Sequence, residues 1–120
     1  MSKILIVEDN KDILNIYKKE LEYNKYDVES AETGQSGIDL IEKDSFDLII
    51  LDIMLPDISG IELLKKAKEK DKKQKVVMLT NVDIPAVVNE AYANGADGYL
   101  IKAELLPTQV VEEIQRYLNE

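Results

Sequence analysis

The sequence predicts an α/β fold in which one parallel sheet lies between layers of helices. Five short apolar runs alternate with segments whose apolar residues recur every three or four positions, which is the pattern of stacked βαβ units. The third of these runs, residues 46–52, is almost continuously apolar, as expected for a parallel strand buried on both faces. With 120 residues, the chain is expected to form a single domain, residues 1–120, without an output domain.

The first half of the chain contains three expected strands and two helices. Residues 3–7 form the first strand, and Asn10 then caps a helix. A more polar second strand covers residues 26–31, Thr33 precedes the second helix, and residues 46–52 form the third strand. The residues expected on the buried faces of the two helices are Ile13, Leu14, Tyr17 and Leu21, then Gly37, Ile38 and Ile41.

Proline and glycine residues delimit the elements of the second half. Pro56 and Gly60 mark a loop, after which a third helix exposes its charged residues between positions 65 and 73. Strands are expected at 75–79 and 98–101, while Pro85 and Pro107 suit the first turns of the fourth and fifth helices. Gly95 ends the fourth helix. The expected core residues are Leu63, Leu64 and Ala67, then Val87, Val88, Ala91 and Tyr92, then Val110, Val111, Ile114 and Leu118.

The composition excludes several classes of function. The chain has no Cys and no His, which rules out disulfides, thiolate or imidazole metal sites and the common nucleophilic triads. A net charge of −9 disfavours nucleic acid as a partner. No apolar run approaches the roughly 18 residues that span a membrane, and the start of the chain leads into a strand instead of a signal peptide. We therefore expect a cytoplasmic protein with no membrane partner.

Polar residues follow four of the five strands, and the carboxyl ends of parallel strands meet at one edge of the sheet, where ligands bind. Glu8, Asp9 and Asp52 would repel one another there unless a cation bound between them. Oxygen ligands favour Mg²⁺, with Mn²⁺ as a possible substitute. Asp carboxylates form aspartyl phosphates, and Thr80 and Lys102 could hold the phosphoryl oxygens. These residue types indicate a switch operated by phosphate.

With these residues, the chain from Lys3 to Leu118 resembles the receiver domain of bacterial two-component response regulators. The loop at 52–60 and the run at 91–102 are also similar to the family's segments. Within that family, the chain is similar to the stand-alone receivers of the chemotaxis and sporulation type. The resemblance implies a flavodoxin-like (βα)5 sandwich with strand order 2-1-3-4-5.

The resemblance also implies roles for the site residues. Asp52 would accept a phosphoryl group from a phosphohistidine of a sensor histidine kinase or phosphotransfer protein. Mg²⁺ would be bound by Asp9, Asp52 and the backbone carbonyl of Met54, with Glu8 acting largely through water. Lys102 would bind the phosphoryl group.

The resemblance also implies that a second pair of residues transmits the signal. Thr80 and Tyr99 would form a switch that couples phosphate to the surface of the fourth helix, fifth strand and fifth helix. A downstream protein would bind that surface, and the chain would be a monomer or a phosphorylation-dependent dimer. It would be a phosphoacceptor that assists its own phosphorylation and dephosphorylation, and not an enzyme.

Three positions depart from the family pattern or vary within it. Ala103 stands where a cis proline is usual, so we expect a trans peptide bond and a shifted loop. Asn81 replaces a small residue and is expected to crowd or hydrogen-bond the phosphoryl group. Met54 occupies a variable position, and its apolar side chain should favour a long-lived phosphorylated state.

Two alternative functions remain. The first is a receiver-like scaffold whose partner binding is independent of phosphorylation. The second is a phosphatase that works through an aspartyl phosphate. That class places a second Asp two residues after the first, where this chain has Met54, so the sequence favours it less.

Overall fold

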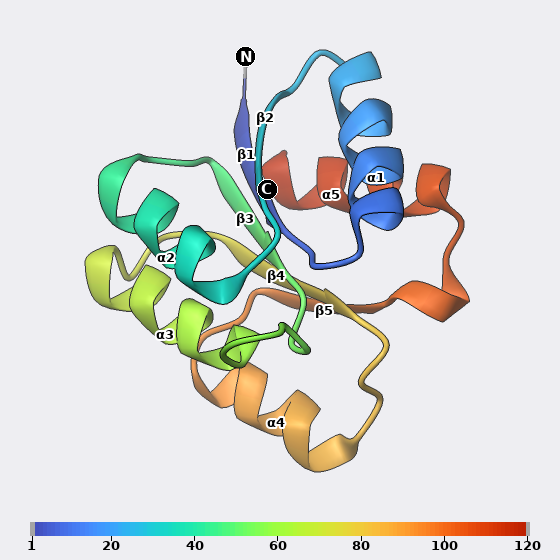
Figure 1. Cartoon of the computed structure of the whole chain (residues 1–120). Helices are drawn as coiled ribbons and strands as arrows, with labels where there is room; N and C mark the ends of the chain where they lie inside the picture. Colours follow the sequence, from blue (N-terminus) through green and yellow to red (C-terminus); the bar gives the residue numbers. More distant parts are fainter. Residues whose placement is uncertain (1, 120) are drawn as a thin grey trace.

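The computed structural model describes residues 2–119, in which five strands alternate with five α-helices (Figure 1). The elements are β1 (Lys3–Val7), α1 (Lys11–Tyr23), β2 (Asp27–Ala31), α2 (Gly34–Lys43), β3 (Leu48–Leu51), α3 (Gly60–Lys70), β4 (Val76–Thr80), α4 (Pro85–Ala93), β5 (Gly98–Ile101) and α5 (Pro107–Leu118). A short 3₁₀ turn, η1 (Lys102–Glu104), follows β5. None of the described helices combines the length and apolar character that crossing a bilayer requires.

The five strands form one parallel sheet in the order β2-β1-β3-β4-β5, which confirms the predicted topology. The pairing register aligns the strand ends, because Val7 of β1 lies opposite Leu51 of β3. The next residues along these strands, Glu8 and Asp52, therefore emerge side by side. On the other half of the sheet, Thr80 of β4 pairs with Ile101 of β5, which brings Lys102 to the same edge.

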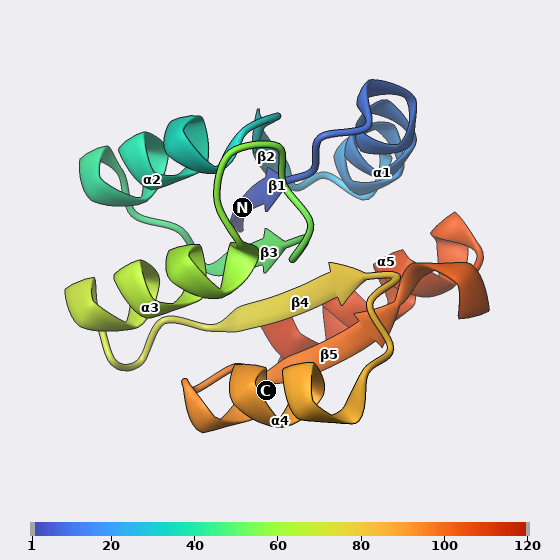
Figure 2. The same ribbon diagram turned by 60° about the horizontal axis from the view of Figure 1, so that its bottom comes forward.

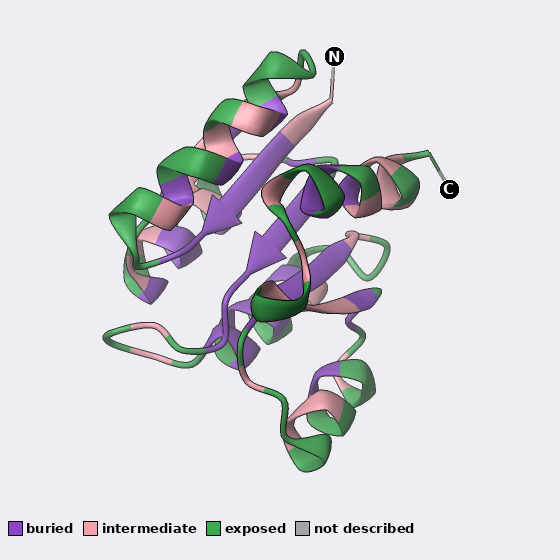
Figure 3. Ribbon diagram, turned by 90° about the vertical axis from the view of Figure 1, so that its right-hand side faces the viewer, coloured by how far each residue is buried: buried purple, intermediate pink, exposed green. Residues whose placement is uncertain are grey.

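Helices cover both faces of the sheet, with α1 and α5 on one side and α2, α3 and α4 on the other (Figures 1 and 2). Alternate strand residues point to opposite faces. Ile4 and Ile6 of β1 pack in the core under α1 and α5, while Leu5 and Val7 pack in the core under α2 and α3. The central strands are buried and the outer helix faces are exposed (Figure 3). The strands are thereby fixed from both sides.

Side-chain caps set the helix starts as the sequence predicts. The side chain of Asn10 accepts hydrogen bonds from the backbone of residues 12 and 13, and Thr33 and Ser36 form a capping box at the start of α2. The third strand is shorter than its apolar run, because Asp47 accepts a hydrogen bond from the backbone N–H of Lys3 at 2.8 Å and β3 begins one residue later.

The fourth helix differs from the prediction. Ala91 is its only buried residue, Val87 and Val88 are half-buried, and Tyr92 is 48% exposed. The nine-residue helix lies over the edge strand β5, which offers too little surface to bury a full apolar stripe. The ring of Tyr92 instead contacts that of Tyr99, with their centroids 6.5 Å apart. The expected end of the helix is confirmed, since Gly95 has a φ of +96°.

The loop between β3 and α3 is closed at Gly60. Its N–H donates to the carbonyl of Ile53 at 2.8 Å, and a Cβ at this position would overlap the backbone oxygen of Asp52. Only glycine lets the start of α3 approach the end of β3 this closely. The packing at Gly60 therefore helps to place Asp52.

We expect Gly60→Ala to lower the free energy of unfolding by about 1–3 kcal/mol, because the added methyl group meets backbone atoms that cannot rotate away. Urea unfolding of both proteins measures this difference. Lys66→Ala, on the exposed face of the same helix, is the matched control and should change stability by less than about 0.5 kcal/mol. Equal stability of Gly60→Ala and the parent would show that the loop adapts.

Candidate functional site

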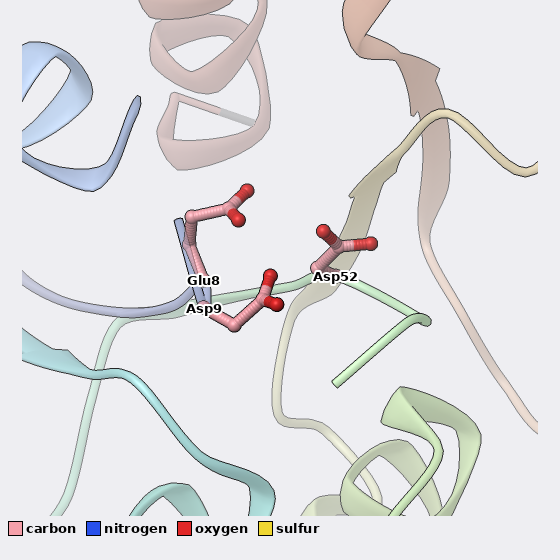
Figure 4. A group of neighbouring side chains, drawn as sticks. All are labelled: Glu8, Asp9 and Asp52. Atoms are coloured by element: carbon pink, nitrogen blue, oxygen red, sulfur yellow. The ribbon is translucent and has the colours of Figure 1, made fainter. Parts of the chain in front are cut away.

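Three carboxylates meet at the carboxyl edge of the sheet. Glu8 and Asp9 follow β1, Asp52 follows β3, and one oxygen of each lies within 4.8 Å of the others (Figure 4). Glu8 and Asp52 are only 3% and 5% exposed, whereas Asp9 is exposed. Figure 4 shows the side chains reaching into the same region from two neighbouring strand ends. The strand register brings Asp52 beside Glu8 and Asp9, which are neighbours in the sequence.

The ammonium group of Lys102 holds the two buried carboxylates. Its Nζ lies 2.6 Å from Glu8 Oε1 and 2.7 Å from Asp52 Oδ2. Burial alone would lower the pKa of Lys102, but its hydrogen bonds to Asp52 and Glu8 outweigh burial and raise the pKa. Burial raises the pKa of Glu8, against the opposing effect of Lys102. Lys102 is therefore a fixed positive charge between two acids.

The other oxygens of the buried acids also have partners. Glu8 Oε2 accepts the N–H of Asn10 at 3.0 Å, and Asp52 Oδ1 accepts the N–H of Met54 at 3.2 Å. The Met54 side chain itself is 70% exposed. The hydrogen bond from the Met54 N–H holds the backbone of the loop after β3 beside the Asp52 carboxylate.

The pair Thr80 and Tyr99 is connected through Val82. Thr80 is 1% exposed, and its hydroxyl accepts the N–H of Val82 at 3.3 Å. The hydroxyl of Tyr99 donates to the carbonyl of Val82 at 2.5 Å. Both side chains therefore bind the same residue of the loop after β4.

The two departures from the family pattern contact each other. The side-chain oxygen of Asn81 accepts the backbone N–H of Ala103 at 2.8 Å, which joins the loops after β4 and β5. The described chain contains no cis peptide bond, so the predicted trans bond before Ala103 is confirmed. The side-chain oxygen of Asn81 is engaged with Ala103, and crowding or hydrogen bonding of a phosphoryl group by Asn81 stays a prediction.

The site has the chemistry of a cation-binding centre. Three carboxylates face one ammonium group, which leaves an excess of negative charge at the sheet edge. Hard divalent cations prefer oxygen ligands, and a cation here would relieve the repulsion between the acids. The donor set of Glu8, Asp9 and Asp52 therefore fits a divalent metal ion.

The structure brings together the residues that the sequence placed at the strand ends. Glu8, Asp52 and Lys102 are in direct contact, and Asp9 lies beside them. Sequence reasoning missed the role of Val82 between Thr80 and Tyr99, and the bond between Asn81 and Ala103. It also missed Asp57, which binds the start of α2. Partners 22 or more residues apart leave no local pattern in the sequence.

Comparison with known proteins agrees with this geometry. Residues 4–115 match the family model of the response regulator receiver domain. The crystal structure of a CheY-like response regulator receiver domain protein from Methanospirillum hungatei superposes with a TM-score of 0.94, at 36% identity, covering 99% of this chain and 94% of that one. The response regulator TrrA of Thermotoga maritima superposes with a TM-score of 0.86, at 30% identity, covering 98% of this chain and 99% of that one.

The curated relatives that the chain matches by sequence are longer than the chain. The transcriptional regulatory protein TrcR of Mycobacterium tuberculosis is 36% identical over 100 residues, which are 83% of this chain but 39% of that protein. The chain thus spans less than half the length of this relative. The match over nearly all of its residues, together with the strand order and the acidic edge, establishes that the chain belongs to the receiver domain family of two-component response regulators.

Proposed function

We propose that Asp52 accepts a phosphoryl group from a phosphohistidine of a sensor histidine kinase or phosphotransfer protein. The observation that carries this proposal is the buried Asp52 carboxylate, bound by Lys102 and set beside two further acids at the sheet edge. An aspartate that served only as a helix cap would not need this environment. The position of Asp52 at the end of β3 leaves it next to the exposed Asp9.

We propose Mg²⁺ as the cation, with Mn²⁺ as a substitute. Asp9, Asp52 and the Met54 carbonyl would hold it directly, and Glu8 would act largely through water. Support comes from the oxygen donors of the cluster and from the TrrA structure, which was solved in complex with Mg²⁺-BeF. Bound at this edge, the ion would neutralise charge on the acids and on an incoming phosphoryl group.

The reaction needs no side-chain acid or base from this chain. An oxygen of Asp52 attacks the phosphorus, the P–N bond to the donor imidazole breaks, and the imidazole, which carries a proton on its other ring nitrogen, takes the bonding electron pair and leaves as a neutral group. Asp52 then carries an acyl phosphate. Lys102, already bound to Asp52, can follow the negative charge to a phosphoryl oxygen, and the hydroxyl of Thr80 can donate to another.

The output of the switch is proposed for the surface of α4, β5 and α5. Movement of Thr80 toward the phosphoryl group would break or shift its bond to Val82, and the bond of Tyr99 to the same residue would change with it. A downstream protein would read that surface, with the chain acting as a monomer or a phosphorylation-dependent dimer. We propose a cytoplasmic phosphoacceptor that assists its own phosphorylation and dephosphorylation and is not an enzyme.

Incubation with acetyl phosphate and Mg²⁺ should add the mass of one phosphoryl group, because acetyl phosphate replaces the phosphohistidine as donor. Intact mass spectrometry measures the product. Asp52→Asn and a reaction with EDTA should both show no gain. An unmodified protein with acetyl phosphate and with a phosphohistidine donor would favour the phosphorylation-independent scaffold.

Met54→Asn should shorten the lifetime of the phosphorylated protein, because an exposed amide beside Asp52 can orient an attacking water molecule and a thioether cannot. The decay of the phosphorylated mass over time gives the rate. Met54→Leu keeps an apolar side chain and should decay like the parent. An unchanged or slower decay of Met54→Asn contradicts this role.

Lys102→Met should lower the free energy of unfolding in EDTA by about 3–5 kcal/mol, because it leaves Glu8 and Asp52 buried without their cation. Mg²⁺ should recover part of this loss, since removal of the ammonium group leaves more negative charge at the site and Mg²⁺ should then stabilise this variant more than it stabilises the parent. Urea unfolding with EDTA and with Mg²⁺ measures both effects. Lys3→Met, which removes an ion pair with Asp44 away from the site, should respond to Mg²⁺ like the parent. The same Mg²⁺ response in both variants would count against the proposed site.

A further inference from the structure

The loop that follows Asp52 is fastened to the start of α2 by Asp57. Asp57 Oδ1 accepts the N–H of Gly34 at 2.8 Å, and Oδ2 accepts the N–H of Gln35 at 2.9 Å. These are the first two N–H groups of the helix, which have no partners within it. Hydrogen bonds from Gln35 and Gly34 lower the pKa of Asp57.

Because Gly34 has no side chain, the loop packs closely against the start of α2. A Cβ at Gly34 would overlap Cγ1 of Ile58 and would lie 3.0 Å from Asp57 Oδ1. The half-buried side chain of Ile58 packs against the core under α2 and α3. Asp57 and Ile58 therefore dock the loop through one polar and one apolar contact, and both depend on the missing side chain of Gly34.

The start of α2 does not need Asp57 for all of its capping. Thr33 and Ser36 already form a capping box there, and the Thr33 hydroxyl accepts the N–H of Ser36 at 3.1 Å. The carboxylate of Asp57, which comes from a distant part of the sequence, accepts the two remaining N–H groups and so connects the loop to α2. The loop at 53–59 is thus held at three places, by Met54 on Asp52, by Asp57 on α2 and by Gly60 on Ile53.

We propose that Asp57 is a positioning residue for the metal site, which it serves by docking the loop of Met54 on α2. This inference rests on the proposed function, because it concerns the affinity of the Mg²⁺ site that Asp9, Asp52 and the Met54 carbonyl would form. Asp57 lies outside that ligand set and acts through the backbone between residues 54 and 57. Outer residues that orient metal ligands typically contribute about 10- to 100-fold to metal affinity.

The chain offers a matched control at the other end of the same helix. Lys70 of α3 donates to the carbonyls of Ile41 at 2.6 Å and Asp44 at 2.5 Å, where α2 ends. It ties α2 to α3 as Asp57 ties α2 to the loop, but it does not touch residues 53–59. Removing Lys70 tests whether any loosening of α2 affects the metal site.

Three variants separate docking from charge and from helix stability. Asp57→Ala removes the two hydrogen bonds and one negative charge. Gly34→Ala keeps every charge and favours the helix, yet its methyl group displaces Ile58 and Asp57. Lys70→Met is the control. Isothermal titration calorimetry with Mg²⁺ gives the affinity of each protein, and urea unfolding in EDTA gives its stability.

Asp57→Ala and Gly34→Ala should each weaken Mg²⁺ binding about tenfold, whereas Lys70→Met should bind like the parent even where it is less stable. Mg²⁺ affinity of Gly34→Ala equal to that of the parent overturns the proposal, because any loss in Asp57→Ala would then come from its charge. An equal loss in Lys70→Met also overturns it. If Asp57→Ala does not fold, Gly34→Ala decides. A parent protein that binds no Mg²⁺ contradicts the proposed function itself, which distinguishes the two failures.

Discussion

The ion pairs of Lys102 with Glu8 and Asp52 are the constraint on which this site depends. A parallel sheet brings its strand ends to one edge, and here that edge receives two nearly buried carboxylates and a third that is exposed. Buried charges are costly unless they are paired and hydrogen-bonded. Lys102, which follows the edge strand β5, pairs with both carboxylates. The fold therefore tolerates an acidic cluster and still leaves negative charge that can bind a cation.

The loops around this edge are connected to one another and to the helices. Val82 links Thr80 to Tyr99, and Asn81 links the loop after β4 to the turn after β5. On the opposite side of the site, Asp57 lies at the positive end of α2 and Lys70 at its negative end, the arrangement that the helix dipole favours. Two sets of contacts therefore surround Asp52. One set leads to α4 and β5, and the other leads to α2.

Much of the fold and of the site could be predicted because both follow from regular patterns. Continuous apolar runs indicated four of the five strands, and the polar residues that follow them indicated Glu8, Asp52 and Lys102. The error in α4 had a physical cause, since periodicity reports which residues share a helix face but not how much sheet lies beneath it. Contacts between distant loops, such as that of Asp57 with α2, depend on side-chain positions that only the folded backbone defines.

Asn81 and Ala103, taken separately, suggest a damaged receiver site, but their contact gives a different interpretation. Proline has no N–H, whereas alanine at position 103 has a backbone N–H that can donate a hydrogen bond. Asn81 accepts that donor at 2.8 Å. Asn81 and Ala103 thus form one contact, a hydrogen bond that joins the loops after β4 and β5 beside Lys102. Because Glu8, Asp52 and Lys102 keep their contacts under this arrangement, the loss of the proline is no evidence against phosphorylation of Asp52.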